Sequence, residues 1–159
     1  MVFLDRPPLK GDEVADLVLA VLTDEQRSEL ENHLSLEYAH EISGQGRYRV
    51  TIVRQRPGWD ATYRVLQARI PTVAELGLPE SVLRLADFRQ GMVLITGPAG
   101  CGKTTTMASL VEYVNVTRQE HIITLEWPIE FIFQSKRSHI TQRQIGSHSH
   151  SYQRALRAA

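Results

Sequence analysis

The chain has 159 residues, 42% hydrophobic and 23% charged, which is typical of a globular protein and excludes a disordered or fibrous one. Eighteen basic residues balance eighteen acidic ones, so the formal net charge is zero and no nucleic-acid partner is expected. The single cysteine, Cys101, excludes a disulfide framework within the chain.

No segment has the composition of a membrane span. The apolar run from Val14 to Leu22 is short and contains Asp16, whereas a span needs ~18 uncharged apolar residues. The first residues, Met1 to Pro8, lack the apolar core of a signal peptide. We therefore expect a cytoplasmic protein with no transmembrane segment.

The first part of the chain predicts a small α+β domain over residues 1–68. Apolar spacing predicts two helices within 11–33, the second begun by a capping box at Thr23 and Gln26. Strands follow at 37–42, 47–53 and 59–66, with turns between them. Six arginines and one acid lie between Arg47 and Arg69, which favours either local anion binding or simple solvation of the strand faces.

The second part predicts an α/β domain over residues 81–159, after a linker at 69–80 rich in proline and glycine. A short helix at 81–88 precedes an apolar strand at 92–96, a helix at 102–116 and a second apolar strand at 121–125. Strand, helix and strand in this order predict a parallel sheet. A last helix begins at Ser151. The predicted core stripe of the long helix is Met107, Leu110, Val111 and Val114.

A phosphate-binding motif lies between the first of these strands and its helix. The residues are Gly97, Pro98, Ala99, Gly100, Cys101, Gly102, Lys103 and Thr104, which match G-x-x-x-x-G-K-[ST], followed by Thr105. Glycines let main-chain N–H groups converge on an anion, and the helix N-terminus adds further donors. The lysine supplies a charge for the β and γ phosphates, and the Thr104 hydroxyl suits Mg²⁺. The motif predicts an ATP and Mg²⁺ site.

These residues also carry a family resemblance, which covers about residues 22–159. The motif leads to His121–Phe131 (HIITLEWPIEF), then to Ser135–Arg137, to Gln142 and Arg143, and to Arg154–Ala159 (RALRAA). Together they resemble the secretion-ATPase superfamily, and within it the PilT-like twitching-motility ATPases that retract type IV pili. The resemblance implies a PAS-like N-terminal domain joined to a RecA-like ATPase domain, and a ring hexamer with ATP between subunits. It also implies a cytoplasmic location at the inner-membrane pilus base, with the pilus platform as partner.

The resemblance assigns roles at matching positions. Glu130 matches the last acid of the family's E-D-P-I-E box, the general base that activates water, and Glu126 matches the first. Arg64 matches the arginine of an F-R-x-I-P motif in the N-terminal domain, which reaches nucleotide in the family. Arg49 and Arg56 are weaker candidates for the same cationic rim.

The sequence departs from the family pattern at two places. Trp127 stands where the box has an aspartate, and an indole can neither accept the hydrogen bonds nor carry the charge of a carboxylate. The family also continues into a Walker B strand and a histidine box that follow the region matched here, so the chain resembles a fragment. We expect the two apolar strands to lack ladder partners, and the isolated chain to be inactive in hydrolysis.

Several alternatives stay open at this point. The chain is either part of a retraction motor, a hydrolysis-dead nucleotide-binding remnant, or part of a type II secretion or pilus-assembly ATPase. An unrelated P-loop kinase would need an acceptor motif, which is not visible, and a DNA translocase is disfavoured by the zero net charge. His139, His148 and His150 lack the spacing of a metal site, and a polar loop is expected there.

Overall fold

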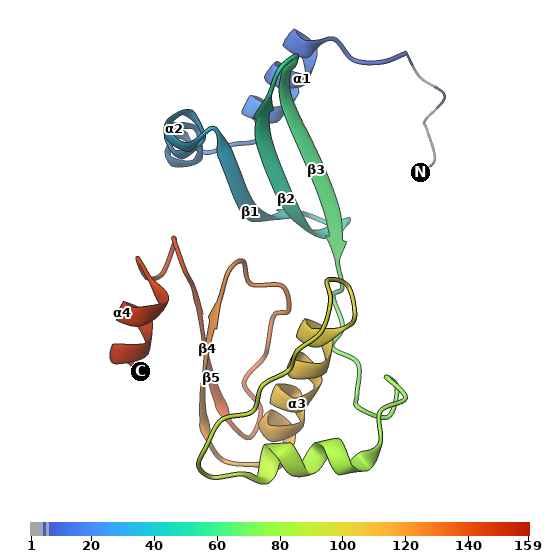
Figure 1. The fold of residues 1–159 in the computed structure, drawn as a ribbon, viewed down its shortest axis with the longest axis vertical. Helices are drawn as coiled ribbons and strands as arrows, with labels where there is room; N and C mark the ends of the chain where they lie inside the picture. The colour runs from blue at the N-terminus through green and yellow to red at the C-terminus, as the bar shows by residue number, and fades with distance from the viewer. Residues whose placement is uncertain (1–4, 6) are drawn as a thin grey trace. The chain divides into compact units, whose positions relative to one another are not determined.

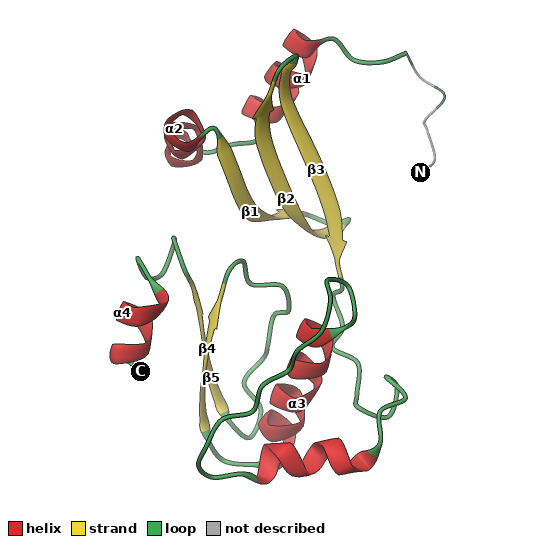
Figure 2. Cartoon of the chain, in the orientation of Figure 1, coloured by secondary structure: helices red, strands yellow, loops and turns green. Residues whose placement is uncertain are grey.

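The computed structural model describes residue 5 and residues 7–159, so most of the stretch examined for a signal peptide lies outside the described residues. The chain divides into an N-terminal unit, Met1–Leu66, and a C-terminal unit, Gln67–Ala159. Figure 1 labels the elements, and Figure 2 shows how helices and strands are distributed over the two units. Among the described residues, no helix combines the length and the apolar character needed to cross a bilayer.

The N-terminal unit pairs two helices with an antiparallel sheet, as the sequence predicts. Helix α1 (Gly11–Ala20) contacts strand β3, and helix α2 (Asp24–His33) contacts strand β1. The strands β1 (Ser35–Ile42), β2 (Gly46–Gln55) and β3 (Gly58–Leu66) lie in the order β1-β2-β3. The core is formed by Val18, Leu22, Leu30, Leu36, Tyr38, Val50 and Ile52, so one face of the sheet packs beneath the helices. On β2, Arg47 and Arg49 occupy positions that alternate with the core residues Val50 and Ile52.

Helix α2 begins with the predicted capping box. The Thr23 hydroxyl accepts from the main-chain N–H of Gln26 at 3.2 Å, and the Gln26 side chain accepts from the N–H of Thr23 at 3.0 Å. These two bonds satisfy main-chain donors that no helical carbonyl can reach.

We expect Thr23→Ala to lower the free energy of unfolding of the N-terminal unit by about 1 kcal/mol, because it removes the cap. Urea unfolding followed by the fluorescence of Trp59, which packs against this core, measures the change. Ser28→Ala, an exposed change in the middle of the same helix, is the control and is expected to have almost no effect. Equal losses in the two variants would contradict a capping role.

The C-terminal unit contains one long helix and a two-stranded parallel sheet. Its elements are the 3-10 helix η1 (Glu80–Asp87), α3 (Lys103–Thr117), β4 (His121–Glu126), β5 (His139–Gln144) and α4 (Tyr152–Arg157). Strand β4 pairs with β5 in parallel, from His121 opposite His139 to Glu126 opposite Gln144. Helix α3 contacts η1 and helix α4 contacts β4.

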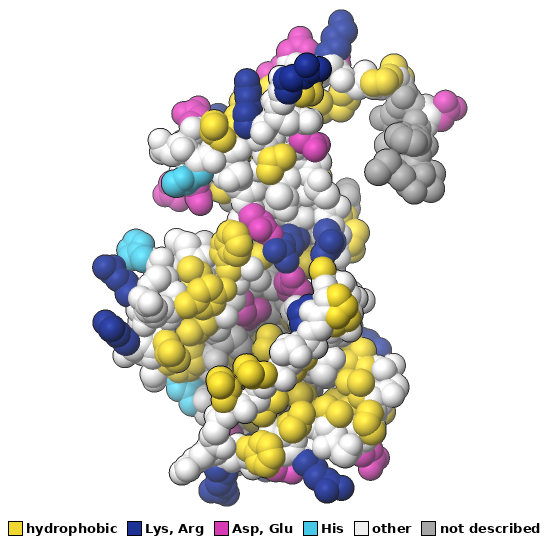
Figure 3. All heavy atoms as spheres, in the orientation of Figure 1, with side chains coloured by type: hydrophobic (Ala, Val, Ile, Leu, Met, Phe, Trp, Pro, Cys, Tyr) yellow, Lys and Arg dark blue, Asp and Glu magenta, His cyan; other side chains and the backbone are white. Residues whose placement is uncertain are grey.

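The predicted strand at 92–96 does not form. These residues follow an irregular path, because no described strand runs beside them to complete a ladder. Met92 and Leu94 are 82% and 72% exposed. Figure 3 shows exposed hydrophobic side chains over the C-terminal unit. The expectation of a missing ladder partner is therefore right for this segment. It is wrong for β4, which pairs with a strand, β5, that the sequence analysis did not predict.

The predicted core stripe of α3 is only partly buried. Leu110 is 9% exposed, but Met107 is 52% exposed, and the stripe lines a cavity in place of packing against a neighbouring strand. The reason is the same irregular segment at 92–96, which leaves that side of the helix without a sheet.

The segment predicted as a linker is held by specific contacts within the C-terminal unit. Val73 is 5% exposed, and the Ser109 hydroxyl of α3 donates to the Pro71 carbonyl. Thr72 and Glu75 form a reciprocal turn in which the Glu75 carboxylate accepts from the Thr72 N–H at 2.8 Å and the Thr72 hydroxyl accepts from the Glu75 N–H at 3.2 Å.

These contacts set the ionisation of Glu75. The N–H of Thr72, and next the Arg69 guanidinium, lower the pKa of Glu75 to about 2 from the ordinary 4.5. Since the folded pKa is lowered, this turn is stabilised at every pH above about 4.5, and the stabilisation is lost as the pH falls from there toward 2. In a ¹³C NMR titration, Arg69→Gln is expected to raise the midpoint of Glu75. Arg84→Gln, on exposed η1, is expected to leave it unchanged, and equal midpoints in all three proteins would contradict the assignment.

Candidate functional site

The glycine-rich loop before α3 has the main-chain conformation that the motif requires. Gly102, the residue that caps α3, has φ 92°, a left-handed conformation that side chains disfavour. Gly97 has φ 151°, which side chains rarely adopt, and a Cβ there would lie 2.7 Å from the Cys101 sulfur, so another residue would be strained and would displace the Cys101 side chain. The first helical bond of α3 is Thr106 N–H to Gly102 O at 2.8 Å. The N–H groups of Lys103, Thr104 and Thr105 therefore precede the helical ladder, where an anion is favoured.

Lys103 lies over the loop that precedes it. Its ammonium donates to the Gly97 carbonyl at 3.0 Å and to the Pro98 carbonyl at 2.7 Å. An ammonium carries three donors, so a third remains for an anion in the loop. The residues between Pro98 and Gly102 are small: Ala99, Gly100 and Cys101, whose thiol is exposed.

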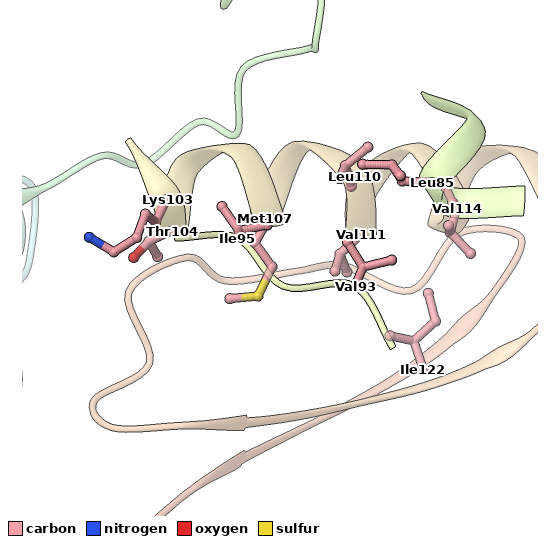
Figure 4. Close-up of a pocket in the computed structure, with 11 residues that line it drawn as sticks. Leu85, Val93, Ile95, Lys103, Thr104, Met107, Leu110, Val111, Val114 and Ile122 are labelled. Atoms are coloured by element: carbon pink, nitrogen blue, oxygen red, sulfur yellow. The ribbon is translucent and has the colours of Figure 1, made fainter. Parts of the chain in front are cut away.

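An apolar cavity of about 490 Å³ extends from the loop along α3. It lies between α3, residues 93–95, η1 and β4. Figure 4 shows Lys103 and Thr104 at the N-terminal end of α3 and the apolar side chains, Met107 to Val114, following along the helix. The polar end of this cavity is therefore formed by two residues of the motif that predicts a phosphate site, Lys103 and Thr104.

A second cavity, of about 210 Å³, brings two predicted site residues together. Thr104 and Glu126 both line it, with Phe131, Phe133 and the facing side of α3 and β4. The Glu126 Oε1 accepts from the Thr124 hydroxyl at 2.6 Å and from the Gln142 amide at 3.0 Å. The hydroxyl predicted to bind Mg²⁺ and the first acid of the box thus share one cavity.

Glu130 lies on the segment that follows β4. Its neighbours Ile129 and Phe131 are 8% and 6% exposed, while Glu130 itself is half-buried. Trp127, which stands at the position of the family's aspartate, is 54% exposed, so its side chain lies at the protein surface. The residues on both sides of Glu130 are therefore buried, which restricts the main chain at this position.

Arg64 belongs to the N-terminal unit. It is exposed on β3, directly opposite Arg49 of β2. Arg49 forms an ion pair with Glu37 of β1, and all three line a polar cavity of about 290 Å³ with Thr51 and Thr62. Arg56 lies in the exposed turn between β2 and β3.

Two residues that contact the candidate site were not among the predicted site residues. The side chains of Gln142 and Gln144, on β5, contact the segment that carries Glu130. The available signal was a pair of glutamines two positions apart, which would share one face of a strand.

Among the described residues, no group of three His, Cys, Asp or Glu side chains could hold a metal ion. The Nδ1 of His148 accepts a hydrogen bond from the Gln144 N–H at 3.0 Å.

Comparison with known proteins supplies a family. A family profile described as "Type II/IV secretion system protein" matches residues 44–159. The chain is 36% identical over 156 residues to the "Type IV pilus retractation ATPase PilT" of Pseudomonas aeruginosa, covering 98% of this chain and 45% of that protein. It is also 36% identical to the "Twitching motility protein" of Neisseria gonorrhoeae, covering 98% of this chain and 42% of that one.

A solved structure agrees with the sequence comparisons. The structure titled "Crystal Structure of the Pilus Retraction Motor PilT and Bound ADP" matches with a TM-score of 0.86 and 39% identity, over 92% of this chain and 43% of that one. The chain thus spans less than half the length of these relatives. The match confirms the predicted α/β fold class, with part of a RecA-like domain in the C-terminal unit.

Proposed function

The chain belongs to the type II/IV secretion system protein family, and from this premise we propose that it is the nucleotide-binding part of a type IV pilus retraction motor. The observation that carries the proposal is the cradle at residues 97–105, formed by glycines in the required conformation, an uncommitted lysine donor and the start of α3. A relative solved with bound ADP supports a nucleotide as the ligand. Retraction is favoured over secretion or pilus assembly because similar relatives carry the names PilT and twitching motility protein.

The residues present fit ATP and Mg²⁺. The N–H groups of the loop and of the first turn of α3 bind the phosphates, and Lys103 places its charge on the β and γ oxygens. Thr104 offers a hydroxyl oxygen, a ligand that Mg²⁺ prefers. When bound, Mg²⁺ neutralises charge on the phosphate oxygens.

Glu130 acts as the general base in this proposal. Its carboxylate takes a proton from a water as that water attacks the γ-phosphorus in line, while the bond from the γ-phosphorus to the β–γ bridging oxygen breaks and ADP leaves. Glu126 orients the box through its bonds to Thr124 and Gln142. Arg64, from the PAS-like N-terminal domain, stabilises charge on the phosphoryl oxygens of a neighbouring subunit's nucleotide in a hexameric ring.

The location and partners follow from the same proposal. The motor is a homo-hexamer at the cytoplasmic side of the inner membrane, where it acts on the platform of the pilus. The domains are then the PAS-like unit at 1–68, a connector at 69–80 and the RecA-like part at 81–159.

A measurement of phosphate release distinguishes a hydrolytic subunit from a nucleotide-binding remnant. The tryptophan at position 127 favours the remnant. With Mg-ATP and the purified chain, hydrolysis that falls at least about 100-fold in Glu130→Gln is the result expected of a general base. Glu120→Gln, an exposed acid before β4, is the matched control and should retain the rate. Tight binding without any phosphate release would establish the hydrolysis-dead alternative for this chain, whereas equal hydrolysis rates in Glu130→Gln and the wild type would refute the role of Glu130.

A further inference from the structure

The segment after β4 is held by a side-chain amide from β5. The amide nitrogen of Gln142 donates to the Phe131 carbonyl at 2.9 Å, and its oxygen accepts from the Phe133 N–H at 2.8 Å. The same nitrogen donates to the Glu126 Oε1 at 3.0 Å. One side chain therefore joins the acid at the end of β4 to two main-chain positions just after Glu130.

Only an amide satisfies this set of partners. The Phe131 carbonyl and the Glu126 carboxylate need donors, while the Phe133 N–H needs an acceptor. Glutamine offers both kinds of group on one planar end, whereas glutamate offers acceptors alone when ionised. The orientation of the amide is fixed by its partners, since a main-chain N–H cannot accept and a carbonyl cannot donate.

A second glutamine holds the other side of Glu130. The Gln144 oxygen accepts from the Ile129 N–H at 3.1 Å, and its nitrogen donates to the Ser147 hydroxyl at 3.2 Å. Gln142 and Gln144 are two positions apart and face the same segment. The main chain is thereby bonded at Ile129, Phe131 and Phe133, and Glu130 lies between the first two.

We propose that Gln142, assisted by Gln144, is a positioning residue that fixes the main chain around Glu130 and so sets where its carboxylate lies. The position of the Glu130 carboxylate matters for catalysis only under the proposed function, in which Glu130 is the general base. Gln142 does not contact the phosphate cradle, so it acts on the base and leaves nucleotide affinity unchanged.

Amide exchange measured by NMR on the full chain tests the contact. In Gln142→Leu, the protection of the Phe133 amide is expected to fall about tenfold or more, because its acceptor is gone. The Arg118 amide, bonded to Val114 O at the end of α3, should keep its protection and shows that the unit stays folded. The ¹³C shift of the Glu130 carboxyl should also move. Gln134→Leu, an exposed change one residue past Phe133, is the matched control and should move neither signal.

The variant Gln142→Glu keeps the size of the side chain and makes its hydrogen bonding depend on pH. At pH 7.5, Gln142→Glu places a carboxylate against Glu126 and Phe131 O, and the Glu130 signal should shift as in Gln142→Leu. At a pH low enough to protonate this carboxyl, its single O–H donates to one of the two acceptors and its other oxygen accepts from the Phe133 N–H, so part of the wild-type shift should return when both proteins are compared at the same pH. The leucine variant should show no such recovery. Because neutral side chains of similar size differ only in these bonds, a purely space-filling role would leave leucine like the wild type.

The outcomes separate this proposal from the proposed function. If Phe133 protection and the Glu130 shift are unchanged in Gln142→Leu, the positioning role is overturned whatever the chain does with nucleotide. If both change while the wild-type chain binds nucleotide and releases no phosphate, the positioning role stands and this chain is the hydrolysis-dead alternative. Where the wild type hydrolyses ATP, Gln142→Leu should lower kcat with KM unchanged, and a change in KM alone would overturn the proposal.

Discussion

Replacing Lys103 by alanine is expected to remove most of the stabilisation that Mg-ATP gives the C-terminal unit. A charge-assisted hydrogen bond contributes about 1.5–3 kcal/mol, so its loss weakens binding by roughly 10- to 100-fold. At a nucleotide concentration of about 100 times the wild-type Kd, ligand stabilises a protein by about 2.7 kcal/mol. A 100-fold weaker Kd leaves only about 0.4 kcal/mol at the same concentration.

Thermal unfolding with and without Mg-ATP measures this loss. Lys136→Ala removes the same charge from the same unit, where the side chain pairs with Glu112, and is the control. The control should lose little nucleotide-dependent stabilisation, because an exposed ion pair is worth at most about 1 kcal/mol and does not touch the cradle. If Lys103→Ala and wild type gain equal stability from Mg-ATP, the loop is not the nucleotide site.

Replacing Asn115 by leucine is expected to destabilise the C-terminal unit by about 3 kcal/mol. The Asn115 side chain is fully buried on α3 and connects that helix to the segment leading into β5. Its nitrogen donates to the Gln134 carbonyl at 2.8 Å and to Glu112 at 2.9 Å, and its oxygen accepts from the Lys136 N–H at 3.0 Å. Leucine has similar size but leaves these main-chain groups without partners, and each such group costs about 1–3 kcal/mol.

Tryptophan fluorescence resolves which unit is affected. Trp59 lies in the N-terminal unit and Trp127 in the C-terminal unit, so a Trp59→Phe background leaves one reporter for the latter. Urea unfolding in that background should show the loss for Asn115→Leu. Asn32→Leu, an exposed change in α2, should leave the curve unchanged. A loss below about 0.5 kcal/mol, which is the spread of ordinary surface changes, would contradict the role of Asn115.

Structural features that depend only on residues close together in the sequence could be predicted from it. The cap of α2 needs only Thr23 and Gln26, three positions apart, and both bonds are present. The glycine-rich loop at 97–102 is equally local, and its three glycines have the positive φ angles that the motif leads us to expect, while phosphate binding there stays a prediction. The alternation in β2 likewise predicts which residues, such as Val50 and Ile52, face the core.

Features that depend on distant partners could not be predicted in this way. Strand β5 is polar over Thr141–Gln144 and forms because β4 offers a parallel edge, which no local pattern reveals. The apolar run at 92–96 has the composition of a strand but follows an irregular path, since ladder bonds require a neighbour. The role of Gln142 likewise depends on how the main chain at Phe131 and Phe133 crosses β5.

Isothermal titration of the purified chain with Mg-ATP and Mg-ADP tests the central claim most directly. We expect saturable binding of one nucleotide per chain, which disappears when Gly102 is replaced by valine because the left-handed cap of α3 cannot form. A chain shown to be folded by its amide spectrum that nevertheless takes up neither nucleotide would contradict the assignment of residues 97–105 as a phosphate cradle.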